Sequence, residues 1–373
     1  MALNKLGLPN ITVIFQGKAN TAIARSEKGV ACLIIKDNVK EDKRLFTYKN
    51  FIEVEKDDFI EENYRIIEDV FMSDVNKLYV IKIHVGEDGQ TDIRKAKKVG
   101  EDFKTIQHLI KKDVNWITFI AEDLEEQKML ANFVKAENKV RIRKLKAICY
   151  KHTLADDMQV VNFMNETVTK SGGLVWPGYK YMGRLLGILA ACRLDQSATY
   201  KELRDLEEVS EFEDIDDVIA KGGFTLINDD DYVRVGRAIN SMQTNDKNHT
   251  EDMRYIAIVE GMNLMYEDVV KTFKESYIGK FKNSYDNQVL LISAINSYFR
   301  SLAKDEVLDP NFNNHAEVDV ETQREKWIAD GNTEAEGWNE KEVKNMTYRT
   351  NVFLTAKVKF LNAIEDLDFV VNM

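Results

Sequence analysis

The spacing of apolar residues in the first 150 positions predicts alternating strands and helices. A continuous apolar run at residues 30–35 is typical of a strand buried on both faces, and further strand patterns lie at residues 78–85, 116–121 and 145–150. Amphipathic helical patterns occupy the intervening segments at residues 59–71, 91–112 and 124–134. Strands and helices in this order form right-handed crossovers, so we expect an α/β core with a mostly parallel or mixed sheet and flanking helices.

The pattern changes after residue 160. A strand is expected at 160–168, followed by a Gly-Gly turn at 172–173 and a helix at 179–193. Residues 224–227 and 232–235, joined by Asn-Asp-Asp-Asp, have the pattern of a β-hairpin. Further helical patterns then dominate, at residues 252–274, 287–304 and 320–328. We therefore expect a helix-rich C-terminal domain.

Both chain ends have strand patterns that lack a partner nearby in the sequence. Near the start, residues 11–15 read Ile-Thr-Val-Ile-Phe, and near the end apolar and polar residues alternate through 352–360 and again after 366. Strict alternation marks a strand with one buried face. We expect both ends to be arms that pair with a sheet of another subunit, through Ile11, Val13, Phe15, Val352, Leu354, Val358, Phe360, Leu367 and Phe369.

These patterns divide the chain into four parts. The predicted parts are an N-terminal arm at 1–28, an α/β core at 29–245, a C-terminal domain at 246–350 and a C-terminal β-arm at 351–373. The length of 373 residues is enough for more than one domain. The net charge of −11 disfavours a general nucleic-acid binder, which is normally basic. Three widely separated cysteines in apolar runs indicate free thiols made in a reducing cytosol.

Sequence signals for catalysis, cofactors and metals are weak. Gly178 and Gly183 have the spacing of a phosphate loop, but the lysine is missing and Leu185 stands where Ser or Thr would bind magnesium. The five histidines lack the spacing of a helical metal site, and no nucleophile-elbow or dinucleotide fingerprint is present. We expect no enzyme activity, no cofactor and no metal. An α/β enzyme whose site is assembled only in three dimensions stays open as an alternative.

Charge is segregated along the chain. Residues 135–151 contain seven bases and one acid, whereas residues 202–217 contain nine acids and one base. Two solvated surfaces would explain this pattern, and so would complementary patches that meet between subunits. A nucleic-acid patch is a third reading, weakened by the lack of interleaved aromatic residues. For the second reading, Arg141, Arg143 and Lys144 of one subunit are expected to approach Glu207, Glu208, Glu211 or Asp214 of another.

Three segments carry a resemblance to a known family: the opening GLPNITVIFQGKANTAIARSEKGVACLIIKD, the stretch GGLVWPGYKYMGRLLG and the end TYRTNVFLTAKVKFLNAIEDLDFVVNM. They resemble contractile tail sheath proteins of the small kind, found in Gram-positive myophages, defective prophages and R-type phage-tail bacteriocins. The opening resembles the start of these proteins, and the end resembles their C-terminal arm. The chain is short for this family, with no room for the extra outer domains of larger sheaths.

The resemblance implies a structural protein without catalysis. Its subunits would stack as hexameric rings around an inner tube, and contraction would drive the tube through the target cell envelope. Implied partners are further copies of the chain, the inner tube protein, and the baseplate and terminator or collar proteins, with no direct nucleic-acid binding and no membrane insertion. Assembly in the bacterial host cytoplasm, followed by incorporation into a virion tail or tail-like particle, is also implied. The alternatives are a cytosolic α/β enzyme and another tail protein of the tube or baseplate.

Overall fold

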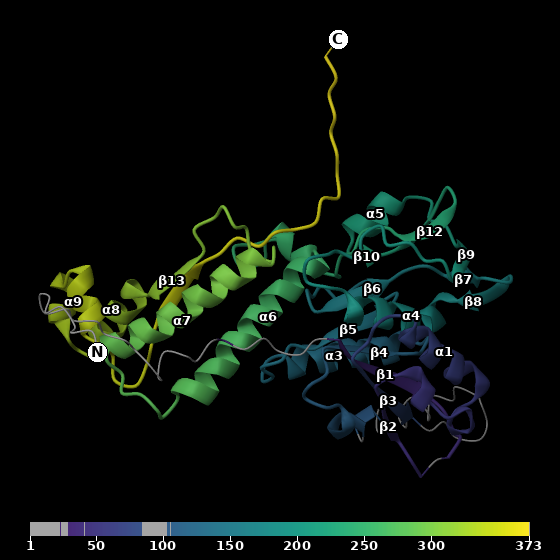
Figure 1. The fold of residues 1–373 in the computed structure, drawn as a ribbon, viewed down its shortest axis with the longest axis horizontal. Helices are drawn as coiled ribbons and strands as arrows, with labels where there is room; N and C mark the ends of the chain where they lie inside the picture. Colours follow the sequence, from purple (N-terminus) through teal and green to yellow (C-terminus); the bar gives the residue numbers. More distant parts are fainter. Residues whose placement is uncertain (1–22, 24–28, 41, 84–102, 105, 373) are drawn as a thin grey trace, which may run out of the picture. The chain divides into compact units, whose positions relative to one another are not determined.

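The computed structural model describes residues 23, 29–40, 42–83, 103–104 and 106–372. The chain divides into two compact units (Figure 1). The described residues of 25–267 and 360–373 form the larger unit, and residues 268–359 belong to the smaller unit. Each unit is described separately below.

The larger unit is built on a seven-stranded sheet in the order β10-β6-β5-β4-β1-β3-β2. Its strands are parallel except for β2, which runs antiparallel to β3 at one edge. This arrangement confirms the α/β fold expected from the apolar runs. The strands are β1 (Val30–Lys36), β2 (Leu45–Tyr48), β3 (Lys77–Ile83), β4 (Trp116–Phe119), β5 (Lys146–Tyr150), β6 (Val160–Phe163) and β10 (Gly223–Phe224).

Helices cover both faces of this sheet. On one face, α1 (Glu61–Phe71) and α4 (Gly178–Ala191) pack against alternate strand residues such as Leu33. On the other face, α3 (Leu124–Glu137) packs against the intervening residues, such as Cys32. Because both faces are covered, β1, β4 and β5 are buried along almost their whole length, and for β1 the continuous apolar run predicts this burial.

The glycines of α4 allow close helix packing. A Cβ added at Gly183 would lie 2.5 Å from Ile66 Cγ2, and one added at Gly187 would lie 2.2 Å from the carbonyl oxygen of Val70. Both contacts are with α1, so the two helices approach each other where side chains are absent. Of the two glycines with phosphate-loop spacing, Gly183 packs on α1, and a Cβ added at Gly178 would lie 1.9 Å from the carbonyl oxygen of Asn165, so close packing explains both.

The rest of the larger unit consists of smaller sheets and short helices. The hairpin expected near residue 230 is confirmed as β11 (Leu226–Asp229) and β12 (Tyr232–Val235). A three-stranded sheet has the order β8-β7-β9, and the expected Gly-Gly turn joins β7 to β8. The remaining elements are β7 (Thr167–Lys170), β8 (Leu174–Pro177), β9 (Leu206–Val209), α5 (Ile215–Ala220), η1 (Phe51–Glu53), η2 (Lys56–Asp58), η3 (Gln107–Leu109) and η4 (Glu251–Arg254).

One expectation about this unit is wrong. Residues 160–168 were predicted as a single strand, but β6 and β7 are separate strands of different sheets. The buried side chain of Asn165 lies between them and binds the backbone of Ser210 and Leu226. These bonds fix a turn that an apolar pattern does not reveal.

The smaller unit is mainly helical, as expected. Residue 268, where it begins, lies within α6 (Ile256–Thr272). Edge-to-face contacts of Trp327 with Trp338 and Tyr348 form an aromatic cluster in this unit. Its other elements are η5 (Phe273–Tyr277), α7 (Tyr285–Lys304), β13 (His315–Val318), α8 (Val320–Ala329), η6 (Thr333–Gly337), α9 (Glu340–Asn345) and β14 (Leu354–Lys357).

Some expectations fall on residues that the structure does not describe. Ile11, Val13 and Phe15 lie outside the described residues, as does most of the helix expected at 91–112. None of the described helices is both long enough and apolar enough to cross a bilayer. Cys32 and Cys149 are buried, and Cys192 is half-buried.

Candidate assembly surfaces

The C-terminal segment has a strand partner in its own chain. β14 pairs antiparallel with β13, and Ala356 lies opposite Ala316. The expectation that residues 352–360 lack such a partner is therefore wrong for the four residues of β14. The partner strand His315–Val318 is also only four residues long, which explains why its pattern did not stand out in the sequence.

The two edges of this small sheet differ. On the outer side of β13, the side-chain amide of Asn296 from α7 donates to the Ala316 carbonyl at 3.1 Å and accepts from its N–H at 2.7 Å. These two bonds satisfy the backbone polar groups of Ala316 that an added strand would need. At Ala316 the β13 edge is therefore closed by a side chain.

The β14 edge is open among the described residues. Backbone hydrogen bonds of an antiparallel strand point alternately to its two sides. The Asp319 N–H donates to the Phe353 carbonyl, so the backbone of Phe353 faces β13. Because the direction alternates from residue to residue, Thr355 and Lys357 also face β13, whereas Leu354 and Ala356 face away from it. The sheet contains only β13 and β14, and no described strand lies beyond β14. An extended segment could therefore add along this edge.

The chain after β14 is fixed to the loop that precedes β13. Asp309 binds Lys359 twice, through its N–H to the Lys359 carbonyl at 2.8 Å and through its carboxylate to Lys359 Nζ at 2.9 Å. The ammonium of Lys359 lowers the pKa of Asp309. Asn314 also accepts from the Lys359 N–H at 2.9 Å. The position of the C-terminal segment is thus set on both sides of β14.

The predicted arm residues differ in exposure. Val352, Leu354, Val358 and Phe360 are half-buried, whereas Leu367 and Phe369 are 83% and 79% exposed. Residues 361–372 carry neither helix nor strand. The end of the chain therefore presents apolar side chains to solvent, as an unpaired arm would.

The predicted basic contact residues bind groups of their own chain. Arg141 is buried and pairs with Glu137 at 2.8 Å. Arg143 pairs with Glu267 at 2.6 Å and also donates to the Asp113 carbonyl at 2.6 Å. These side chains therefore stabilise the larger unit.

Lys144 is likewise held within the larger unit. Its Nζ donates to the Asn138 carbonyl at 2.6 Å and lies 4.4 Å from the ring centre of Tyr266. Burial lowers the pKa of Lys144. This side chain therefore has a role in packing.

The predicted acidic contact residues lie at the surface of the larger unit. Glu207 accepts from the Gly172 N–H at 2.8 Å, Glu211 accepts from the Asn228 amide, and Asp214 caps α5. Glu208 is exposed on β9. In the described part of the chain, no ion pair joins this set to the three basic residues, and their contact between subunits stays a prediction.

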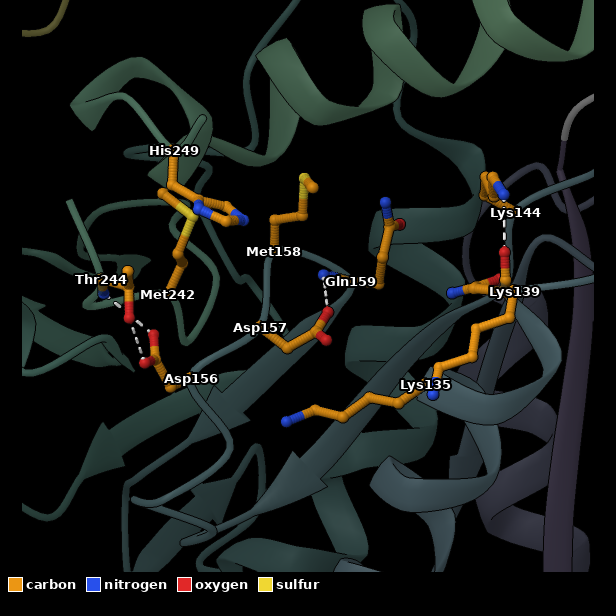
Figure 2. Close-up of a pocket in the computed structure, with 11 residues that line it drawn as sticks. Lys135, Lys139, Lys144, Asp156, Asp157, Met158, Gln159, Met242, Thr244 and His249 are labelled. Carbon is orange, nitrogen blue, oxygen red and sulfur yellow. Dashed lines mark hydrogen bonds between the residues drawn. The ribbon is translucent and has the colours of Figure 1, made fainter. Parts of the chain in front are cut away.

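A pocket of about 370 Å³ lies beside the C-terminal end of α3 (Figure 2). Lys135 donates to the Ala155 carbonyl, and Asp156 accepts from the hydroxyl of Thr244. His249 binds Asp246 at 2.9 Å. Lys135, Asp156 and His249 at this pocket thus bind neighbouring groups of the chain. In the described residues, no cluster of three or more His, Cys, Asp or Glu is placed to hold a metal ion.

Comparison with known proteins gives three relevant similarities. Residues 248–373 match the phage tail sheath C-terminal domain. The tail sheath protein of Clostridium phage phiCD119 is 26% identical over 377 residues, which cover 98% of this chain and 99% of that protein. Among solved structures, the helical sheath of the anti-feeding prophage in its contracted state has a TM-score of 0.68 at 12% identity, covering 98% of this chain and 99% of that one.

A further structure shares the fold. It comes from the 6-fold symmetrised baseplate of the anti-feeding prophage, with a TM-score of 0.63 at 12% identity, and covers 98% of this chain and 99% of that one. The sheath relative and both structures span nearly the whole chain, and the domain match covers its last third. Over nearly its whole length the chain is therefore similar to a tail sheath protein, and its last third matches the phage tail sheath C-terminal domain.

Proposed function

We propose that this subunit polymerises as stacked hexameric rings around an inner tube, and that contraction of the assembly drives the tube through the target cell envelope. The observation that carries this proposal is the open edge of β14, which offers unpaired backbone groups to an added strand. The comparisons support it through a sheath that is helical and contracted and a baseplate that is six-fold symmetric.

Strand addition can connect subunits while their globular parts move. Each new backbone hydrogen bond contributes about 0.5–1.5 kcal/mol net. Several bonds at each of two arms give every subunit links that survive the loss of side-chain contacts elsewhere. In this proposal the segment 11–15 and the segment after residue 351 are the arms, and the edge of β14 is an acceptor.

The proposed partners follow from this assembly. They are further copies of the chain, an inner tube protein, and baseplate and terminator or collar proteins. We propose assembly in the bacterial host cytoplasm, with no catalytic role for the subunit. The division into an arm at 1–28, a core at 29–245, a sheath domain at 246–350 and an arm at 351–373 belongs to the same proposal.

Two alternatives predict different particles. An α/β enzyme would use a reactive site such as the pocket in Figure 2 and would remain dispersed. A tube or baseplate protein would form narrow tubes or discrete rings. Electron microscopy of the purified protein separates these cases, because only a sheath forms long, wide, hollow cylinders.

A proline at Ala356 tests the open edge within that experiment. Ala356→Pro removes an N–H that faces away from β13 and leaves the bonds of Thr355 and Lys357 to β13 in place. We expect a folded protein that no longer forms cylinders. The matched control is Thr355→Val, which keeps every backbone donor of β14 and should assemble. Cylinders formed by Ala356→Pro at the wild-type concentration would contradict this use of the edge.

A further inference from the structure

The last residues of the chain are attached to the larger unit at one point. Arg237, which follows β12, reaches two consecutive carboxylates of the C-terminal segment. Its Nη2 donates to Asp366 Oδ1 at 2.5 Å, and its Nε lies 3.7 Å from Glu365 Oε2. Its Nη1 donates to the hydroxyl of Tyr255 at 3.3 Å, which fixes the guanidinium from a third side. A planar guanidinium suits such multiple contacts better than an ammonium group.

Glu365 is the buried member of this contact. Its side chain is only 5% exposed, and Ser197 Oγ lies 3.3 Å from its second carboxylate oxygen. Asp366 is 75% exposed and lies at the outer side of Arg237. A buried carboxylate is costly unless it keeps a charged partner and hydrogen bonds. Glu365 therefore depends on Arg237 to stay in place.

The chain is exposed on both sides of the attached pair. Ile364 is 97% exposed, and Leu367 and Phe369 are also largely exposed. Glu365 and Asp366 thus hold this part of the chain through polar contacts, because the apolar side chains of Ile364, Leu367 and Phe369 are exposed. The apolar side chains beyond them are left available for another surface.

We propose that Arg237, with Ser197 and Tyr255, clamps Glu365 and so sets the point and direction at which residues 367–372 leave the subunit to reach a second copy. This clamp rests on the proposed assembly, to which it adds a positioning residue outside the arms. Holding the base of an arm lowers the entropy lost when its end pairs with a neighbour. The clamp also keeps residues 367–372 attached to the larger unit while subunits move.

A spin label next to the clamp tests the attachment in the unassembled protein. The label is placed at Ile364→Cys in a Cys192→Ala background, because Cys32 and Cys149 are buried. We expect a restricted label in this parent protein and a clearly more mobile one after Arg237→Ala. Arg237→Lys should give an intermediate result, since it keeps the charge but loses the planar contacts. Arg193→Ala is the matched control, because Arg193 is exposed and pairs with Asp195.

Assembly of the same variants tests the positioning role. Arg237→Ala should raise the protein concentration needed for polymerisation about tenfold, because the arm is no longer held at its base. The variant should still unfold in the same thermal transition as the parent protein. Arg193→Ala should leave that concentration unchanged. Unchanged label mobility in Arg237→Ala would overturn the clamp, whatever happens to assembly. A mobile label together with normal assembly would overturn its positioning role. If the parent protein forms no polymer, the proposed function fails, and the label still decides whether the clamp exists.

Discussion

The seven-stranded sheet and the β13–β14 sheet differ in whether their edge strands are open to pairing with another chain. The large sheet ends in two short strands, β2 with four residues and β10 with two, and its central strands are buried on both faces. The small sheet has one edge closed by Asn296 and the other open at β14, whose residues are mostly exposed. Short edge strands limit pairing with other chains, whereas an open edge allows a strand of another chain to pair with it. The comparison separates a sheet that stabilises the fold from one suited to linking subunits.

Removing the C-terminal arm should have the largest effect on assembly. Deletion of residues 351–373 takes away β14 and the segment held by Arg237 but leaves the large sheet intact. We expect a folded protein that forms no polymer, as judged by circular dichroism and electron microscopy. Cylinders formed by the deleted protein would show that the small sheet is not needed for linkage.

Arg143→Ala should act on the fold of the larger unit. The substitution leaves Glu267, whose side chain is only 6% exposed, without its charged partner. We expect a loss of about 3 kcal/mol in the free energy of unfolding, measured with denaturant. Lys151→Ala is the control in the same basic segment, because its pair with Glu166 is exposed and contributes little to stability. Equal effects of the two substitutions would contradict the structural role of Arg143.

Gly187→Ala tests the packing that supports the large sheet. The added Cβ would lie 2.2 Å from the Val70 carbonyl, so α1 and α4 must separate. We expect a loss of about 2 kcal/mol in the free energy of unfolding, with linkage through the small sheet unaffected in the molecules that stay folded. Gly337→Ala, where an added Cβ meets nothing within 4 Å, is the control. A stable Gly187→Ala protein would mean that the two helices have room to adjust.

Asn296→Ala should make the two edges of the small sheet more alike. It removes both side-chain bonds to the Ala316 backbone. We expect a loss of about 1–2 kcal/mol in stability and a broader distribution of particle sizes in sedimentation, since a second strand edge becomes available. Asn345→Ala on α9, whose exposed amide binds only within its own helix, serves as the control. An unchanged size distribution would show that the closed edge does not restrict association.

The sequence was sufficient for the central strands of the large sheet because they are mostly apolar and alternate with helical patterns. The runs at 30–35 and 145–150 correspond closely to β1 and β5. No such run marks β2, β9 and β13, whose four residues each mix polar with apolar side chains. Short strands gain their partners from tertiary packing, which the local pattern does not contain.

The assembly surfaces were predictable only in part. Alternation at residues 352–360 indicates a strand, but Asn296 looks in the sequence like any polar helix residue and gives no sign that it closes an edge. The partner of Arg143 lies 124 residues away, so its charge alone looks available for another subunit. The pairing of Arg237 with Glu365 and Asp366 is equally remote in sequence. Such contacts depend on how the chain folds back on itself.

Hydrogen exchange at β14 tests the central claim most directly. The N–H groups of Leu354 and Ala356 face away from β13, whereas those of Thr355 and Lys357 face toward it. With strand addition at this edge, the first pair should exchange quickly in the unassembled subunit and become protected in the polymer. The second pair should be protected in both states. Polymers in which Leu354 and Ala356 exchange as quickly as in the unassembled subunit would contradict linkage through β14.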